Sequence, residues 1–236
     1  MPKTFSIPPL EAGGRQLFIA DIHGCFYSLE SLWQKLRVIP KDQVFFLGDY
    51  INKGPHSRKV INYIRELQHQ FPYIYALMGN HEEMLLQADR SGLATRTTFC
   101  ERLNSGDLLN SQQQLDQEIK QWIQNLPLYF ETEHWMCSHA GFDLSSIENL
   151  YSNQLAMLTI RNFPYLSTTA RNKKIIHGHN PFPWQEIQEK LETHASIMGI
   201  DNGCVYAGQR AGHGRLICYN LTDHELISQK KSIQDF

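Results

Sequence analysis

The sequence predicts an α/β domain, and three observations support this. The 236 residues are 42% apolar and 19% charged, which is enough apolar surface for a packed core and too little charge for a disordered chain. In the first half, short apolar runs of strand length alternate with segments of helical periodicity. Each of the first three runs ends in a polar cluster, as strands do where ligands bind at the edge of an open α/β sheet.

The first half contains three successive units of strand, loop and helix. Strands are expected over residues 16–20, 44–47 and 74–77, which are rich in β-branched, aromatic and other apolar residues. After the first two strands, apolar residues recur at three- and four-residue spacing, as on the buried face of a helix. The third strand leads into a helix that begins near Asn80 and contains Met84 and Leu85.

Strand patterns predominate in the second half. The expected strands cover residues 134–137, 173–176, 196–200, 205–207 and 216–219. Between the halves, residues 88–125 are polar and rich in glutamine, with helical periodicity only around Leu115, Ile119 and Trp122. We predict that this segment is a helical insertion within a single domain of residues 1–236. We also expect it to line the site. The four tryptophans are interpreted as packing residues, and Trp122, within the insertion, is the one candidate among them for contact with the substrate.

The composition argues against several classes of partner. The formal net charge is −2 and no run of Lys or Arg exceeds a pair, so neither a nucleic-acid surface nor a polybasic membrane anchor is expected. No apolar run reaches the length of a membrane span or a signal peptide. The five cysteines include no CxxC pair, which favours reduced thiols. We therefore expect a cytoplasmic protein, with secretion by a non-classical signal left open.

Asp, His and Asn residues follow the ends of different expected strands. Asp21 and His23 follow the first strand, Asp49 the second and Asn80 the third. Because parallel strands end at the same edge of a sheet, these side chains should lie close together. Imidazole, carboxylate and amide oxygen together suit divalent metals of intermediate hardness. Two such ions about 3.5–4 Å apart need a bridging ligand, and the carboxylate of Asp49 is the natural candidate.

Six short motifs extend this pattern along most of the chain. They are ADIHG at residues 20–24, GDYINKGP at 48–55, GNHE at 79–82, SHAG at 138–141, HGHNP at 177–181 and IDNGC at 200–204. Together they resemble the motifs of the calcineurin-like metallophosphoesterases. Their order and spacing are similar to those of the phosphoprotein phosphatase group, which includes compact bacterial serine/threonine protein phosphatases and symmetrical diadenosine tetraphosphatases.

The resemblance implies a two-sheet αββα sandwich with two divalent ions at the carboxyl edge of the sheets. The ligands it implies for the first ion are Asp21, His23 and Asp49, and those for the second are Asp49, Asn80, His139 and His179. His177 is the alternative to His179, which we prefer because the family's ligand follows the glycine of this motif. Manganese is the ion we expect, and iron, zinc and magnesium are compatible with the same donors.

The resemblance also implies roles for four residues beside the metals. His81 would act as the general acid, and Asn52 stands where protein phosphatases of this group usually have an aspartate paired with that histidine. Lys53 and Arg161 stand where the family places arginines, and they would bind the substrate phosphate. Two cations lower the pKa of a shared water and neutralise phosphate oxygens, which implies direct in-line hydrolysis without a phosphoenzyme.

These residues predict a metal-dependent phosphoesterase, for which three functions remain open. The first choice is a phosphoprotein phosphatase acting on phosphoserine, phosphothreonine or phosphotyrosine. The alternative is a symmetrical dinucleoside tetraphosphatase with a nucleotide substrate. The second alternative is a metal-binding interaction protein with weakened catalysis, because Asn52 and Lys53 depart from the family pattern. A zinc-protease helix is excluded, since Leu85 stands where HExxH requires its second histidine.

Overall fold

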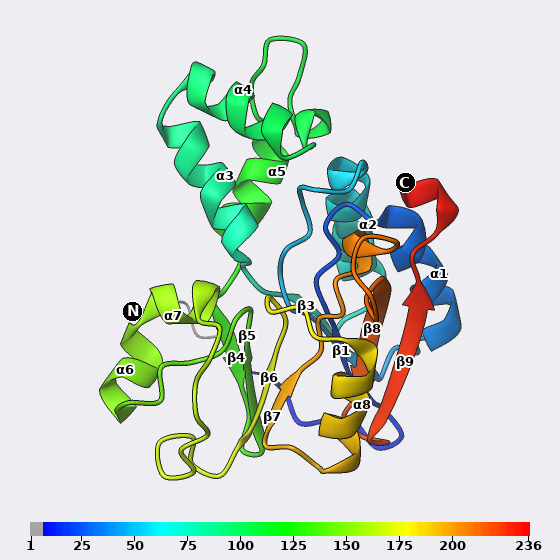
Figure 1. The fold of residues 1–236 in the computed structure, drawn as a ribbon, viewed down its shortest axis with the longest axis vertical. Helices are drawn as coiled ribbons and strands as arrows, with labels where there is room; N and C mark the ends of the chain where they lie inside the picture. Colours follow the sequence, from blue (N-terminus) through cyan, green and yellow to red (C-terminus); the bar gives the residue numbers. More distant parts are fainter. Residues whose placement is uncertain (1–6) are drawn as a thin grey trace.

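Two β-sheets packed face to face form the centre of the molecule in the computed structural model, which describes residues 7–236 (Figure 1). The first sheet has the order β3-β2-β1-β8-β9, and its strands are β1 (Gln16–Ile19), β2 (Gln43–Phe46), β3 (Ile74–Ala76), β8 (Arg215–Asn220) and β9 (Glu225–Lys230). The second sheet has the order β4-β5-β6-β7, and its strands are β4 (Tyr129–Glu131), β5 (Trp135–Ser138), β6 (Lys174–His177) and β7 (Ile197–Gly199).

Parallel pairing aligns the strands that precede the motifs. In the first sheet β1, β2 and β3 are parallel, and Val44 of β2 lies opposite Leu17 on one side and Ile74 on the other. In the second sheet β5, β6 and β7 are parallel, and β4 pairs antiparallel with β5. In the first sheet β8 pairs antiparallel with β1 and with β9. The loops that follow the parallel strands of one sheet therefore leave it at a common edge.

Side-chain alternation along the strands gives each sheet two apolar faces. On β1, Phe18 points between the sheets, where its ring stacks on Phe45 at 4.9 Å and meets the edge of Trp135 at 5.0 Å. Its neighbours Leu17 and Ile19 belong to the apolar core on the opposite side of the sheet. Burial of such large apolar side chains stabilises the sandwich by about 1.5–3 kcal/mol each.

Helices cover the outer faces of both sheets. α1 (Phe26–Leu36) and α2 (Ser57–Gln70) share an apolar core with the outer face of the first sheet, and α6 (Ile147–Ser152) and α7 (Gln154–Thr159) share one with the second. α8 (Trp184–Glu192) packs beside β7 and β9. The order helix, sheet, sheet, helix confirms the αββα sandwich. None of the helices within residues 7–236 is long and apolar enough to cross a membrane.

Three helices stand above the sandwich as a separate lobe (Figure 1). They are α3 (Asn80–Arg90), α4 (Leu93–Arg102) and α5 (Gln117–Gln124), with a short 3₁₀ helix, η1 (Gly106–Leu108), between the last two. Trp122 is a packing residue, as interpreted from the sequence: its ring lies 5.4 Å from that of Tyr50 and its Nε1–H donates to Gln68. Trp122 thus attaches α5 to the sandwich.

The second half departs from the sequence prediction in two ways. Residues 205–207, expected as a strand, lie largely in a 3₁₀ helix, η2 (Cys204–Tyr206), and the chain then turns through the positive-φ glycines Gly208 and Gly212. The helices α6, α7 and α8 and the strands β4 and β9 were not predicted. β4 and β9 lie at sheet edges, and β9 carries no fully buried residue, so its apolar alternation is weak. A last 3₁₀ helix, η3 (Ile233–Asp235), ends the chain.

Candidate metal centre

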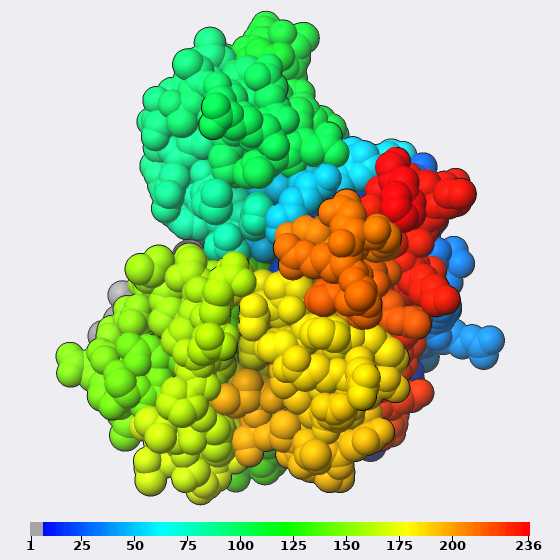
Figure 2. All heavy atoms as spheres, viewed as in Figure 1, coloured from blue at the N-terminus to red at the C-terminus, as the bar shows by residue number. Residues whose placement is uncertain are grey.

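Loops at the ends of five strands supply the predicted metal ligands. The residues of the first sheet are Asp21 and His23 after β1, Asp49 after β2 and Asn80 after β3, and those of the second sheet are His139 after β5 and His179 after β6. In the space-filling view, the lobe, the green-yellow segment after β5 and the orange loop before β8 adjoin on one face (Figure 2). The two sheets thus contribute to a single centre.

Four of these residues form one close group. His139 Nε2 lies 2.9 Å from Asn80 Oδ1, 3.1 Å from His179 Nδ1 and 3.4 Å from Asp49 Oδ1. His179 Nδ1 lies 3.0 Å from Asn80 Oδ1. Two imidazole nitrogens, an amide oxygen and a carboxylate oxygen therefore face one another, which is the mixed donor set that zinc, iron or manganese accepts.

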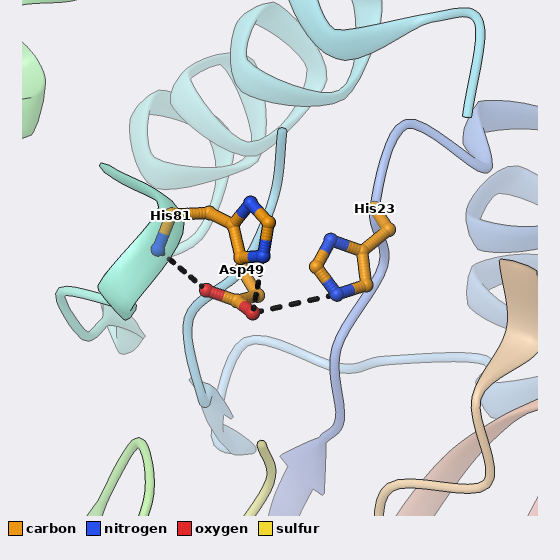
Figure 3. Close-up of side chains that lie close together, drawn as sticks. All are labelled: His23, Asp49 and His81. Carbon is orange, nitrogen blue, oxygen red and sulfur yellow. Dashed lines mark hydrogen bonds and ion pairs between the residues drawn. The ribbon is translucent and has the colours of Figure 1, made fainter. Parts of the chain in front are cut away.

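The other oxygen of Asp49 faces a second group (Figure 3). Asp49 Oδ2 lies 3.4 Å from His23 Nε2 and 4.0 Å from His81 Nε2. Asp49 therefore presents one oxygen to each group, as a bridging carboxylate would. The residue that completes this group within 4.8 Å is His81. The carboxylate of Asp21 instead accepts the backbone N–H of His179, at 2.9 and 3.1 Å.

Backbone carbonyls fix two of the imidazole rings. His139 Nδ1 lies 2.8 Å from the carbonyl oxygen of Leu47, and His23 Nδ1 lies 3.0 Å from that of Ile51. A carbonyl can only accept, so each Nδ1 carries the proton and each Nε2 presents its lone pair to the centre. This tautomer leaves Nε2 as the atom that can bind a metal, and at His23 that atom lies 2.7 Å from Lys53 Nζ. At His179 the atom that faces the group is Nδ1, and its buried Nε2 has no hydrogen-bond partner within residues 7–236.

Three buried carboxylates lie together in the centre and repel one another. Burial, followed by the charges of Asp201 and Asp49, raises the pKa of Asp21 well above its usual value. Burial raises the pKa of Asp201 to about 6. For Asp49, burial also acts to raise the pKa, but the surrounding imidazoles outweigh it and hold the pKa below its usual value. Such a cluster is costly unless cations compensate it, so these donors fit divalent metal ions.

Several of the predicted site residues have strained backbones. Positive φ angles occur at His23 (47°), Asp49 (53°), Asn52 (71°), Lys53 (67°) and His179 (63°), which is a region that residues other than glycine rarely adopt. Each such residue costs on the order of 1–3 kcal/mol, which surrounding contacts must offset. The contacts at this edge of the sheets therefore hold these five residues in a backbone conformation that such residues rarely adopt.

Glu82 holds the loop that carries Asp49. Its buried carboxylate accepts four backbone N–H groups, from Gly79, Asp49, Tyr50 and Ile51, at 2.9–3.3 Å. Burial and the charge of Asp49 raise the pKa of Glu82 to about 8, and the backbone donors oppose that shift. A Cβ at position 79 would collide with the backbone nitrogen of Asp49, so only glycine allows this approach. Sequence reasoning did not assign Glu82 this role.

His81 is paired with a neutral amide. Asn52 Nδ2 lies 2.8 Å from His81 Nδ1, both residues are buried, and Asn52 Oδ1 has no hydrogen-bond partner among residues 7–236. Burial lowers the pKa of His81, the charge of Asp49 opposes that shift, and Lys53 lowers the pKa further. Within the described part of the chain no carboxylate contacts Nδ1, so Asp49, on the Nε2 side, is the charge that favours the imidazolium.

A cleft of about 120 Å³ opens over the centre. It is lined by His23, Asp49, Lys53, Asn80, His81, Arg161, His179, Pro181, Asp201, Tyr206 and Arg210. The cleft therefore brings together both predicted phosphate-binding residues, Lys53 and Arg161. None of the lining residues belongs to 88–125, so the expectation that this segment lines the site is wrong for the cleft itself.

Four residues of the cleft were not predicted as site residues, and one of them, Pro181, belongs to the HGHNP motif. Asp201 was interpreted as a turn residue, whereas Tyr206 and Arg210 lie in the segment misread as a strand and in the loop after it. A tyrosine and an arginine four residues apart in a glycine-containing loop do not by themselves indicate a binding site. The one signal in the sequence is that they follow the IDNGC motif closely. His177, by contrast, packs between Phe163 and Phe182 and away from the cluster, while His179 lies within it.

Comparison with known proteins agrees with this geometry. Residues 14–213 match the family model described as calcineurin-like phosphoesterase. A symmetrical bis(5'-nucleosyl)-tetraphosphatase of Methylococcus capsulatus is 31% identical over 126 residues, which are 52% of this chain and 41% of that protein. The asymmetrical tetraphosphatase PrpE of Oceanobacillus iheyensis is 24% identical over 89% of this chain and 90% of its own length. The first few relatives are thus matched over less than half of their length.

Solved structures share the fold. One described as a candidate diadenosine tetraphosphatase has a TM-score of 0.68 at 20% identity, covering 99% of this chain and all of that one. A serine/threonine phosphatase from Saccharomyces cerevisiae has a TM-score of 0.60 at 18% identity, covering 93% of this chain and 80% of its own. At these identities the likeness establishes the sandwich architecture.

Proposed function

The chain belongs to the calcineurin-like phosphoesterase family, and we propose that it hydrolyses a phosphoanhydride bond in a dinucleoside polyphosphate. Members of the family are metal-dependent hydrolases of phosphoric esters. The residues that would hold two divalent ions are Asp21, His23, Asp49, Asn80, His139 and His179, and manganese is the metal we expect. When bound, the ions would supply a hydroxide at neutral pH and neutralise charge on the phosphate.

Different side chains of the protein would bind the phosphate, donate a proton and hold the ligands in place. Lys53 and Arg161 bind the oxygens of the phosphate under attack, and the fork of Arg161 can hold two of them at once. His81 donates a proton from Nε2 to the leaving oxygen, while the side-chain amide of Asn52 contacts its Nδ1. Glu82 and the backbone carbonyls of Leu47 and Ile51 keep the ligands in place.

The single observation that carries the choice of substrate is the pairing of His81 with Asn52. A buried imidazole whose pKa is lowered, and whose Nδ1 faces an amide where a carboxylate would favour the charged form, is a poorer proton donor at neutral and higher pH. A serine alkoxide is strongly basic and needs that proton to depart, whereas a phosphate of a nucleotide departs with little protonation. The pairing therefore favours a phosphoanhydride over a phosphoserine ester.

The names of the relatives support the same substrate class. Both curated relatives described above are named as tetraphosphatases, one symmetrical and the other asymmetrical. Symmetrical cleavage of diadenosine tetraphosphate yields two ADP molecules, and asymmetrical cleavage yields AMP and ATP. We propose the symmetrical reaction, since the symmetrical relative has the higher identity over the part that it matches, 31% against 24% for the asymmetrical one.

The test is a side-by-side assay on diadenosine tetraphosphate, a phosphoserine peptide and a phosphotyrosine peptide, with Mn²⁺, Zn²⁺, Fe²⁺ and Mg²⁺ supplied separately. We expect kcat/KM for the dinucleotide to exceed that for the phosphoserine peptide by about tenfold or more, since a difference of 1.4 kcal/mol in the barrier is already tenfold. Chromatography of the products distinguishes the two regiochemistries. A reversed order of substrates would contradict the proposal.

Phosphoprotein hydrolysis is the second candidate. The cleft of about 120 Å³ holds little more than one phosphoryl group, whereas sites that enclose a whole small molecule measure roughly 300–1,000 Å³. A phosphorylated side chain needs no more than that. A faster reaction on either peptide would select this function, and no turnover with any metal would favour a binding protein of weakened activity.

A further inference from the structure

Arg210 and Tyr206 line the cleft, and neither of them belongs to the six sequence motifs that contain the predicted metal ligands. The guanidinium carbon of Arg210 lies 3.9 Å from the centre of the Tyr206 ring. The ammonium of Lys53 lies 5.4 Å from the centre of the same ring. Two cations therefore flank one phenol ring beside the metal centre, and Arg161 lines the same cleft. Contact with the ring restrains each cation without neutralising it.

The loop that carries Arg210 is anchored at several points. The backbone N–H of Arg210 and that of Gln209 both bond to the carbonyl of Tyr206. Beyond Arg210, the buried side chain of Asn202 donates to the carbonyl of Gly212 at 2.8 Å and accepts the N–H of Arg215 at 3.0 Å. The Gly212 carbonyl also accepts the N–H of Trp184 at 2.9 Å. Arg210 is thus an exposed side chain on a fixed backbone.

The Arg210 side chain lacks a protein partner. Within residues 7–236, no carboxylate or carbonyl forms an ion pair or hydrogen bond with its guanidinium. By contrast, Arg15, Arg58 and Arg96 each form an ion pair with an aspartate. A guanidinium presents five donors that match phosphate oxygens in pairs, so the free fork of Arg210 has its full donor capacity available to a ligand.

The size of the cleft determines which phosphate Arg210 can reach. Lys53 and Arg161 already suffice for the one phosphoryl group that about 120 Å³ admits. Arg210 is exposed, so its fork lies at the rim of the cleft, where the next phosphate of a chain would emerge. We propose that Arg210, held against Tyr206, binds the phosphate adjacent to the one under attack and so makes the site selective for polyphosphates over monoesters. This inference rests on the proposed function.

The test compares binding of AMP and ADP, which differ by one phosphate, to the manganese-loaded protein by calorimetry. The native protein should bind ADP about 10- to 100-fold more tightly than AMP, which is the range of one charge-assisted hydrogen bond. In Arg210→Gln the preference should fall to about threefold or less. Arg210→Lys keeps the charge and loses the fork, so it should lie between the two.

Two further variants complete the design. Tyr206→Leu removes the ring that restrains Arg210, and it should reduce the preference while leaving the charge in place. Arg171→Gln is the matched control, because Arg171 also lies over a tyrosine, at 5.9 Å from the ring of Tyr151, and is outside the cleft. This control should keep the native preference. Circular dichroism establishes that each variant is folded.

Each outcome decides the proposal. A native protein that does not discriminate ADP from AMP, or an Arg210→Gln variant that still does, would overturn the subsite. Binding is measured without turnover, so it is independent of whether diadenosine tetraphosphate is hydrolysed. If the peptides are the better substrates but Arg210→Gln loses the ADP preference, the proposed function fails and the subsite stands. If the dinucleotide is the better substrate and the preference is unchanged in Arg210→Gln, only the subsite fails.

Discussion

The metal centre and the rim of the cleft differ in burial and in the number of hydrogen bonds that hold their side chains. In the centre, side chains such as His139 and Asp49 are buried and form hydrogen bonds with backbone groups, which hold them in position. At the rim, Arg161 and Arg210 are exposed, and within residues 7–236 the side chain of Arg161 makes one hydrogen bond, of 3.3 Å to Asn180. The buried donors are thus held by backbone contacts, whereas the cations of the rim stand on exposed loops and are left available to a ligand.

The strongest test of the centre is Asp49→Asn. A neutral amide cannot bridge two cations as a carboxylate does, so both metal content and turnover should fall, with activity lost about a thousandfold or more. Metal analysis of the purified variant and steady-state kinetics measure the two effects. Asp223→Asn makes the same chemical change at an exposed turn and should behave as the native protein. A variant that keeps two metals and near-native rates would remove Asp49 from the bridging position.

At the rim, Arg161→Ala should lower kcat/KM by about two orders of magnitude, the typical loss when one donor to a charged transition state is removed. Metal content should stay native, because Arg161 contacts none of the proposed ligands directly. Arg171→Ala removes an arginine outside the cleft and serves as the control. Unchanged kinetics in Arg161→Ala would show that the phosphate is bound without it.

Glu82→Gln tests whether the hydrogen bonds that hold the Asp49 loop are needed for metal binding, while leaving all the proposed ligands in place. Glutamine has one acceptor oxygen, so its NH₂ group would face backbone donors that now bond to the carboxylate. Unsatisfied buried donors cost about 1–3 kcal/mol each, and loss of such outer contacts typically lowers metal affinity about 10- to 100-fold. Urea unfolding and metal titration are the measurements. Glu83→Gln is the adjacent control, since Glu83 bonds to Gln87 and Arg90 on the same helix.

The centre could be predicted from sequence to a far greater extent than the rim. Asp21, Asp49 and Asn80 each follow a strand whose apolar pattern is plain, so parallel pairing alone brings them together. Arg210 depends instead on a turn after η2 and on hydrogen bonds from Asn202, which link residues that no periodicity connects. The hydrogen bonds between Glu82 and the loop of Asp49 were also not predicted, because the sequence shows only the GNHE motif and nothing that indicates which backbone groups its carboxylate binds.

The smallest expected effect concerns the position where the centre and the rim meet, in Asn52→Asp. A carboxylate at 2.8 Å from His81 Nδ1 would favour the imidazolium, so the pKa of His81 should rise, by about one unit or more for an opposite charge at this distance. The proton-donating form then persists to higher pH, and the basic limb of the pH–rate profile should move upward. The shift should be clear for a phosphoserine peptide, whose alkoxide needs the proton, and slight for p-nitrophenyl phosphate or diadenosine tetraphosphate. Profiles for both protein forms on all three substrates measure it, and each substrate serves as a control for the others. Equal shifts for every leaving group, or none, would show that His81 is not the proton donor, and the argument from Asn52 to a phosphoanhydride substrate would then lose its basis.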